Sequence, residues 1–96
     1  MPADCQPQGN DLLIRIRGHF DFSLRPQLQA AAAAEVTGRV RLDLGAVTYL
    51  DACALTLIRQ LADRLNARGL GLAIHNASGD SLRLLRAADL QGLIAD

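Results

Sequence analysis

The stretch "VRLDLGAVTYLDACALTLIRQLADRLNARG", residues 40–69, decides which fold the chain can adopt. Apolar and polar residues alternate at its start, which is the period of a half-buried strand, and we expect a strand over residues 39–44. After Asp51 the apolar spacing changes to three and four residues, which predicts an amphipathic helix over residues 53–67. A strand followed by a helix is the repeating unit of an α/β fold.

The rest of the chain continues this alternation of strands and helices. The sequence predicts further strands over residues 12–17 and 70–75, and further helices over residues 23–36 and 79–88 that begin near Ser23 and Ser78. The last residues, "LQGLIAD", could form a brief strand or a docked tail. Residues 1–10 contain prolines and a glycine and predict a flexible lead-in, so that residues 11–96 form a single α/β domain with parallel crossovers.

The composition of the 96 residues excludes several classes of protein. Ten acidic residues balance ten arginines and only three residues are aromatic, so we expect no nucleic-acid partner. No apolar run is long enough to cross a bilayer, and the N-terminus does not resemble a signal peptide. Cys5 and Cys53 do not suggest a disulfide framework. We therefore expect a cytoplasmic protein without direct membrane insertion.

Loops that follow parallel strands gather at one edge of a sheet, where sites usually form. The loops after the expected strands carry residues that include polar groups able to act there: His19, Asp21, Phe22 and Ser23; Asp51, Ala52 and Cys53; His75, Asn76 and Ser78. We expect these residues to lie near one another. The two histidines with Asp21 lack the tight spacing of metal ligands, so no metal site is predicted.

Cys53 stands at the start of the expected helix and has three interpretations. It is a small residue that fills the place of a serine, a redox-sensitive thiol, or a catalytic nucleophile. Asp51 is a helix N-cap, a partner contact, or both. Ser23 looks like the more direct cap of its helix, which leaves Asp21 as a solvated loop residue or a partner contact.

Residues 11–94 resemble the STAS domain, a family named after sulphate transporters and anti-sigma-factor antagonists. The family pattern has an aliphatic-Asp-Leu strand, then Asp-Ser-Ser-Gly or Asp-Ser-Ser-Ala before a helix; this chain has "RLDL" and "LDACA". A helix that ends at glycine, another strand and a helix that starts near a serine follow in both. Upstream, "IRGHFDFS" is similar to the Gly-x-Phe/Leu-Asp segment of the family. The order and spacing of these motifs carry the resemblance.

The resemblance implies a small mixed β-sheet with helices packed mainly on one face. It implies a free-standing bacterial regulator of the anti-sigma-factor-antagonist type, which binds an anti-sigma factor or a related serine kinase, and not an enzyme; no cofactor is implied. In the family the kinase phosphorylates the second serine of the motif and a phosphatase restores binding. Aligned residue by residue, Asp51 and Asp21 match the family's acids, Ala52 matches the first serine and Cys53 matches the phosphoacceptor. Because no hydroxyl stands at position 53, we expect the usual phosphorylation switch to be absent.

The partner surface is expected around the two acids and along the exposed side of the helix over residues 53–67. Its residues are Asp21, Asp51, Ala52, Cys53, Thr56, Arg59, Gln60 and Asp63. An alternative function uses the same domain edge: small STAS proteins also resemble subunits that dock on the ATPase of phospholipid ABC-transport assemblies.

Overall fold

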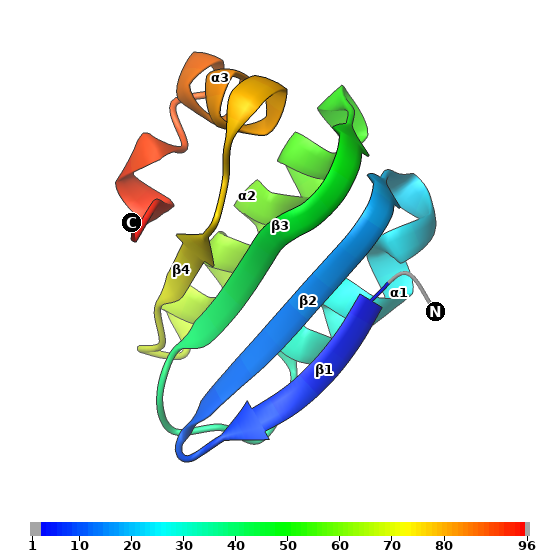
Figure 1. The fold of residues 1–96 in the computed structure, drawn as a ribbon. Coiled ribbons are helices and arrows are strands. Elements are labelled where there is room, and N and C mark those ends of the chain that lie inside the picture. Colours follow the sequence, from blue (N-terminus) through cyan, green and yellow to red (C-terminus); the bar gives the residue numbers. More distant parts are fainter. Residues whose placement is uncertain (1–2, 96) are drawn as a thin grey trace.

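A computed structural model describes residues 3–95 of the chain as a four-stranded sheet with three α-helices (Figure 1). The strands are β1 (Ala3–Gln8), β2 (Asp11–Phe20), β3 (Val40–Leu50) and β4 (Leu72–His75), and the helices are α1 (Arg25–Ala32), α2 (Ala52–Ala67) and α3 (Gly79–Ala87). Short 3-10 turns, η1 (Phe22–Leu24) and η2 (Gln91–Leu93), complete the fold. The strand order is β1-β2-β3-β4, with an antiparallel first pair and two parallel pairs, so the predicted mixed α/β sheet is confirmed.

Helices α1 and α2 cover one face of the sheet, α3 lies beside the end of β3, and the opposite face of the sheet is uncovered (Figure 1). The core lies between the sheet and these two helices. Its most completely buried large side chains are Ile14, Ile16, Phe20, Leu24, Val40, Leu42, Ile58, Leu61, Leu65, Ile74 and Leu85. The apolar side of α2 is thus buried as its spacing predicts, with Leu55 half-buried at its margin.

The prediction of a flexible lead-in over residues 1–10 was wrong for residues 3–8, which form the edge strand β1. Gly9 adopts a left-handed conformation (φ 60°) and turns the chain back so that β1 pairs with β2. Pro7 is compatible with an edge strand, although proline argues against a central one. Residues 1 and 2 lie outside the described residues.

Helix α1 ends at Ala32, earlier than the predicted end at residue 36. The guanidinium group of Arg68, just beyond α2, donates hydrogen bonds to the carbonyls of Ala32 at 2.7 Å and Ala34 at 2.8 Å. These bonds satisfy carbonyls at the helix end and join the ends of α1 and α2.

The expected strands and the C-terminal segment also differ in extent from the structure. Strands β2 and β3 continue past residues 17 and 44 towards the end where α2 begins. At the C-terminus, η2 is followed by a single parallel bridge between Ile94 and Ile74, while residue 96 lies outside the described part. Within residues 3–95, none of the helices combines the length and apolarity needed to traverse a bilayer.

A candidate partner-binding surface

Asp51 fixes the start of α2. Its backbone is extended and its Oδ1 accepts the backbone N–H of Ala54 at 2.9 Å, which confirms the predicted N-cap. Leu50 before it and Ala54 after it are both buried, so the first turn of α2 is anchored to the core on both sides. Ala52 and Cys53 lie between these anchors and are exposed.

Asp21 caps η1, and the expectation that Ser23 is the cap was wrong. The carboxylate of Asp21 accepts both the backbone N–H of Ser23 at 2.9 Å and the Ser23 hydroxyl. The Ser23 hydroxyl first, and its N–H second, hold the pKa of Asp21 below its usual value. Phe20 pairs with Leu50 in the parallel β2–β3 ladder, and therefore Asp21 and Asp51 leave neighbouring strands at the same edge.

Cys53 lies at the surface, as a free thiol in the first turn of α2. It lines a shallow depression, the Cys53 hollow, with Phe22, Arg25, Thr56, Leu57 and Gln60. The Phe22 side chain is 55% exposed, and the Arg25 guanidinium lies over its ring at 5.4 Å from the centroid. Cys53 thus fills no space in the core, and its surroundings combine an exposed aromatic ring with polar side chains.

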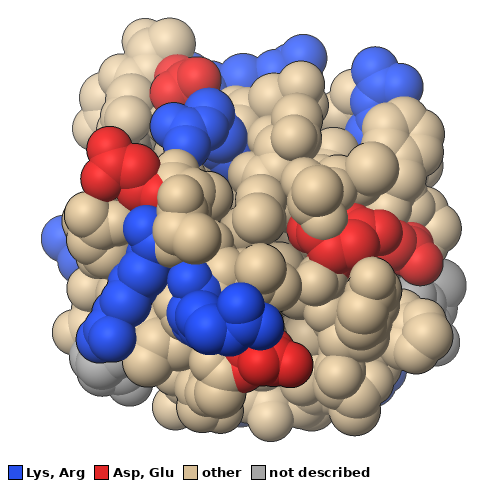
Figure 2. Space-filling view, turned by 90° about the horizontal axis from the view of Figure 1, so that it is seen from above, with Lys and Arg blue, Asp and Glu red and all other residues tan. Residues whose placement is uncertain are grey.

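A second depression lies on the other side of Asp51, between the end of β3 and the start of α3. Tyr49, Asp51, Ala52 and Ser78 are among its lining residues. Tyr49 is 56% exposed, and its ring lies 5.5 Å from that of His19. Figure 2 views the molecule from this end and shows charged side chains in separate groups around a largely uncharged middle.

The two histidines do not join Cys53. Phe20 points into the core between the sheet and the helices, and its neighbour His19 therefore projects to the uncovered face, where it contacts Tyr49. Strand β4 is short and its last residue pairs with Asp43, only the fourth residue of β3, so His75 lies beside Arg41 (3.1 Å between Nη1 and Nε2). The expectation that the loop residues share one edge is therefore wrong for His75, whereas His19 lies at this edge, close to Asp21, with its side chain on the uncovered face.

The predicted contacts on α2 also divide between two sides of the helix. Thr56 and Gln60 line the Cys53 hollow, and the Thr56 hydroxyl donates to the Ala52 carbonyl at 3.3 Å. Arg59 faces the other way and donates to the carbonyl of Ala88, the C-cap of α3. Asp63 is exposed further along the helix.

Phe22, Tyr49 and Arg25 were not among the residues predicted to bind a partner. Two of the three aromatic residues of the chain are exposed here, and that rarity is the one signal in the sequence that could have marked them. Across residues 3–95 no three His, Cys, Asp or Glu side chains come together in a group that could hold a metal ion.

Comparison with known proteins identifies the family of the chain. The family model described as "Mlab, STAS domain" matches residues 4–95. A STAS-domain-containing protein of Pseudomonas aeruginosa is 29% identical over 87 residues, which cover 88% of this chain and 86% of that protein.

Solved structures show the same fold at low sequence identity. An anti-sigma factor antagonist from Mycobacterium paratuberculosis has a TM-score of 0.84 and 15% identity, over 97% of this chain and 81% of that chain. The phosphorylated Bacillus cell fate determinant SpoIIAA has a TM-score of 0.77 and 14% identity, over 98% and 89%. With a family model matched along almost all of its length, the chain belongs to the STAS domain family.

Proposed function

We propose that this STAS domain is a cytoplasmic bacterial regulator that acts by reversible binding to an anti-sigma factor or a related serine kinase, and not as an enzyme. One observation carries the proposal: the first turn of α2 is exposed while its cap is fixed, with Cys53 and the aromatic ring of Phe22 in the same shallow hollow. A rigid helix start beside an exposed aromatic group suits docking, because little conformational freedom is lost on binding. The proposed surface consists of Asp21, Phe22, Asp51, Ala52, Cys53, Thr56 and Gln60, with Arg59 and Asp63 at its margin.

Because position 53 carries no hydroxyl group, this regulator would differ from phosphorylated members of its family in having no phosphoacceptor there. A phosphate group there would add a charge of about −1.5 to −2 beside Asp21 and Asp51. That charge would fall on the partner's docking surface, because the side chain at position 53 is exposed. Cysteine is not a substrate for a serine kinase, so the surface would stay permanently in its unmodified, binding-competent form, and a phosphatase would have no bond to cleave there.

A second candidate function is docking on the ATPase of a phospholipid ABC-transport assembly. Positions 52 and 53 both lack a hydroxyl group and both are exposed. A subunit that stays docked on its ATPase needs a docking surface at these positions but no residue that can be phosphorylated. The absence of hydroxyl groups at the exposed positions 52 and 53 therefore favours the second candidate.

Affinity capture from the native host separates these candidates. Tagged wild-type chain and a Cys53→Asp variant are used as baits, and the captured proteins are identified by mass spectrometry. An anti-sigma factor or serine kinase retained by wild type and lost from the variant supports the regulator, whereas a transporter ATPase with the same behaviour supports the second candidate. If neither an anti-sigma factor or serine kinase nor a transporter ATPase is retained by wild type, both functions are overturned, whereas equal retention of such a partner by both baits would place position 53 outside the interface.

A further inference from the structure

Tyr49 is exposed, and neither the fold nor the proposed surface accounts for it. Among residues 3–95 the large hydrophobic side chains with more than half of their surface exposed are Phe22 (55%) and Tyr49 (56%). Both lie where α2 begins: Phe22 follows Asp21 in η1, and Tyr49 comes two residues before Asp51. Exposed aromatic rings are enriched at protein interfaces, because they bury a large area with few rotatable bonds. Tyr49 therefore indicates a contact that the proposed surface leaves out.

Tyr49 lines the depression between the end of β3 and the start of α3, which we call the Tyr49 hollow. The volume of this hollow is about 470 Å³, and Asp51, Ala52 and Ser78 are among its other lining residues. Cys53, the residue after Ala52, lines the Cys53 hollow instead, so the two hollows lie on either side of the first turn of α2. A partner that covers this turn can therefore reach both hollows.

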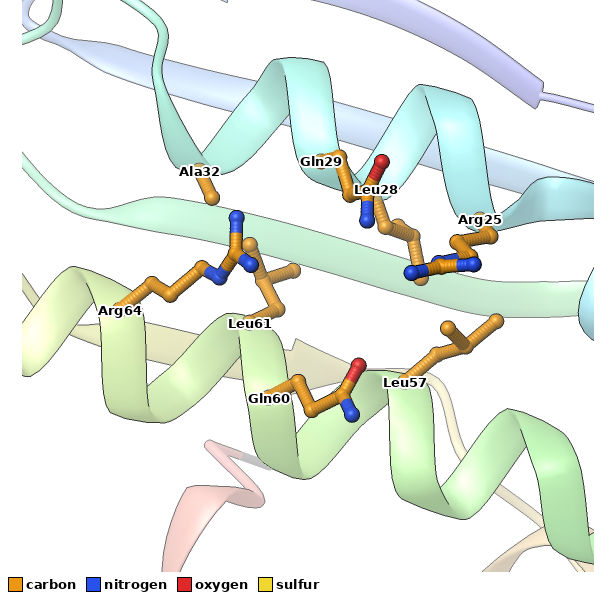
Figure 3. A pocket seen from close by; sticks show the side chains of 8 residues that line it. All are labelled: Arg25, Leu28, Gln29, Ala32, Leu57, Gln60, Leu61 and Arg64. Atoms are coloured by element: carbon orange, nitrogen blue, oxygen red, sulfur yellow. The ribbon is translucent and has the colours of Figure 1, made fainter.

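The surface does not continue in the other direction, between α1 and α2 (Figure 3). The crevice between these helices is closed by side chains of the core, since Leu28, Ala32, Leu57 and Leu61 are at most 5% exposed and the free volume is about 10 Å³. A partner bound at the Cys53 hollow would find no apolar surface there. The open surface next to the first turn of α2 is the Tyr49 hollow.

The exposed ring of Tyr49 carries no cation of its own chain. Its ring contact within residues 3–95 is with His19, at 5.5 Å between centroids. Phe22, on the other side of the turn, differs in this respect, because the Arg25 guanidinium lies 5.4 Å from its ring centroid. The chain thus uses an arginine to cover one of its two exposed rings and leaves the other ring without one.

Polar groups that could bind an arginine surround the ring of Tyr49. Asp51 uses Oδ1 for the cap of α2, and its second carboxylate oxygen accepts no hydrogen bond from residues 3–95. Ser78 is the N-cap residue of α3, yet its hydroxyl does not cap that helix. Asp80 already pairs with Arg83 at 3.0 Å, which leaves Asp51 as the unpaired acid of the hollow. An aromatic ring, a free carboxylate oxygen and a hydroxyl together match a guanidinium group, which stacks on rings and donates several N–H groups in one plane.

We infer that the Tyr49 hollow receives an arginine side chain of the protein partner, an inference that rests on the proposed function. The guanidinium group would stack on Tyr49 and donate hydrogen bonds to the free oxygen of Asp51 and to the Ser78 hydroxyl. Because the cap uses the other oxygen of Asp51, the start of α2 keeps its geometry on binding. Asp51 then lies at the centre of the interface, with Phe22 and Tyr49 on its two sides.

The test measures how tightly Tyr49 variants bind the partner that the wild-type chain captures, which is purified and titrated by calorimetry. Tyr49→Ala removes the ring and should bind about tenfold more weakly than wild type. Tyr49→Phe is the matched control, since it keeps the ring, and its affinity should stay within about threefold of wild type. Circular dichroism melts verify that both variants are folded.

A double-mutant cycle identifies the arginine. Each arginine at the binding surface of the partner is replaced by alanine and by lysine. One Arg→Ala change should weaken binding to wild type about tenfold but binding to Tyr49→Ala by about threefold or less, because the ring contact is already lost. Lysine at the same position should restore only part of the affinity, since its ammonium group is more strongly hydrated and not planar.

The outcomes separate this inference from the proposed function. If Tyr49→Ala binds as tightly as wild type, the inference is overturned, and weak binding by Cys53→Asp in the same series would leave the proposed function standing. If Tyr49→Ala binds weakly but no arginine of the partner couples to it, another group fills the hollow and the inference is again overturned. If no anti-sigma factor, serine kinase or transporter ATPase is captured, the proposed function and the inference both fall.

Discussion

The carboxylate of Asp51 accepts the backbone N–H of Ala54 at 2.9 Å and so closes the first turn of α2. Ala54 is completely buried, which ties this turn to the core, whereas Cys53 beside it is exposed. The first turn of α2 therefore contains both a stabilising cap and residues of the proposed partner surface. Substitutions of Asp51 must separate the hydrogen bond of the cap from the charge of the carboxylate.

Replacing Asp51 with alanine should destabilise the domain by about 1 kcal/mol, because the N–H of Ala54 loses its acceptor. Asp51→Asn should retain most of this stability, since the amide oxygen can accept the same bond without the negative charge. Urea unfolding followed by circular dichroism measures both differences. Equal unfolding midpoints for wild type and Asp51→Ala would show that the cap contributes nothing, while weak partner binding by a stable Asp51→Asn would assign a binding role to the charge.

Substitution of Arg59 should change stability as well as any partner contact, because its guanidinium group binds the carbonyl of Ala88 at the end of α3. We expect Arg59→Ala to cost about 0.5–1 kcal/mol and Gln60→Ala, whose side chain lines the Cys53 hollow, to stay within about 0.5 kcal/mol of wild type. Thermal unfolding midpoints of the two variants provide the comparison. A midpoint for Arg59→Ala identical to that of wild type would argue that the Ala88 contact is energetically neutral.

Features that depend on neighbouring residues were predictable from the sequence. The apolar spacing of α2 and the Asp51 cap are encoded within a few residues, and both were predicted correctly. The end of α1 was predicted incorrectly, because its carbonyls are bound by Arg68, which lies 36 residues from Ala32 in sequence. Strand β1 was missed because its proline and the glycine after it indicate a turn unless the pairing with β2 is known.

The same distinction applies to the candidate site. From the sequence, either Asp21 or Ser23 could cap the helical segment that follows. Only the structure shows that the Asp21 carboxylate accepts the hydrogen bonds from the Ser23 N–H and hydroxyl. The place of His75 depends on the length of β4, which is set by its pairing with β3 and not by local sequence. Exposure of Phe22 is likewise a property of the packed fold.

Acid should destabilise the domain partly through Asp11. Its two carboxylate oxygens accept the backbone N–H of Arg39 at 2.9 Å and the Nε of Arg41 at 2.8 Å, and these bonds, that of Arg39 foremost, hold the pKa of Asp11 below its usual value. Because the folded-state pKa is lower than the unfolded one, this contribution is complete above about pH 5 and is lost as the pH falls through the folded pKa.

An Asp11→Asn variant should therefore lose less of its unfolding free energy than wild type between about pH 5 and pH 2.5, because it lacks the carboxylate that becomes protonated in this range. Urea unfolding at a series of pH values measures the difference. Asp63→Asn, which removes an exposed carboxylate, is the matched control. If the unfolding free energies of Asp11→Asn and wild type fall equally with pH, Asp11 does not contribute to the loss of stability in acid.

Position 53 should accept phosphate once a hydroxyl is restored. Cys53→Ser keeps the exposed site, the Asp51 cap and the start of α2, where free N–H groups and the helix dipole favour a negative group. We expect the captured kinase to transfer labelled phosphate to Cys53→Ser and none to position 53 of wild type, as measured by mass spectrometry of the intact chain and its peptides. A Cys53→Ala variant controls for labelling elsewhere, and phosphate found on wild-type Cys53 would overturn the expectation.

Cys53→Asp should weaken partner binding without unfolding the domain. The new carboxylate adds negative charge at an edge that already carries Asp21 and Asp51, where a phosphate group would lie, while an acid in the first turn of α2 is favourable by about 0.3–1 kcal/mol. Titration calorimetry measures how tightly the partner binds wild type, Cys53→Ser and Cys53→Asp. Because the serine variant changes the side chain without adding a charge, a loss of binding seen only with Cys53→Asp is caused by the charge. If Cys53→Asp and wild type bind equally well, position 53 lies outside the interface, and the partner must bind elsewhere on the domain.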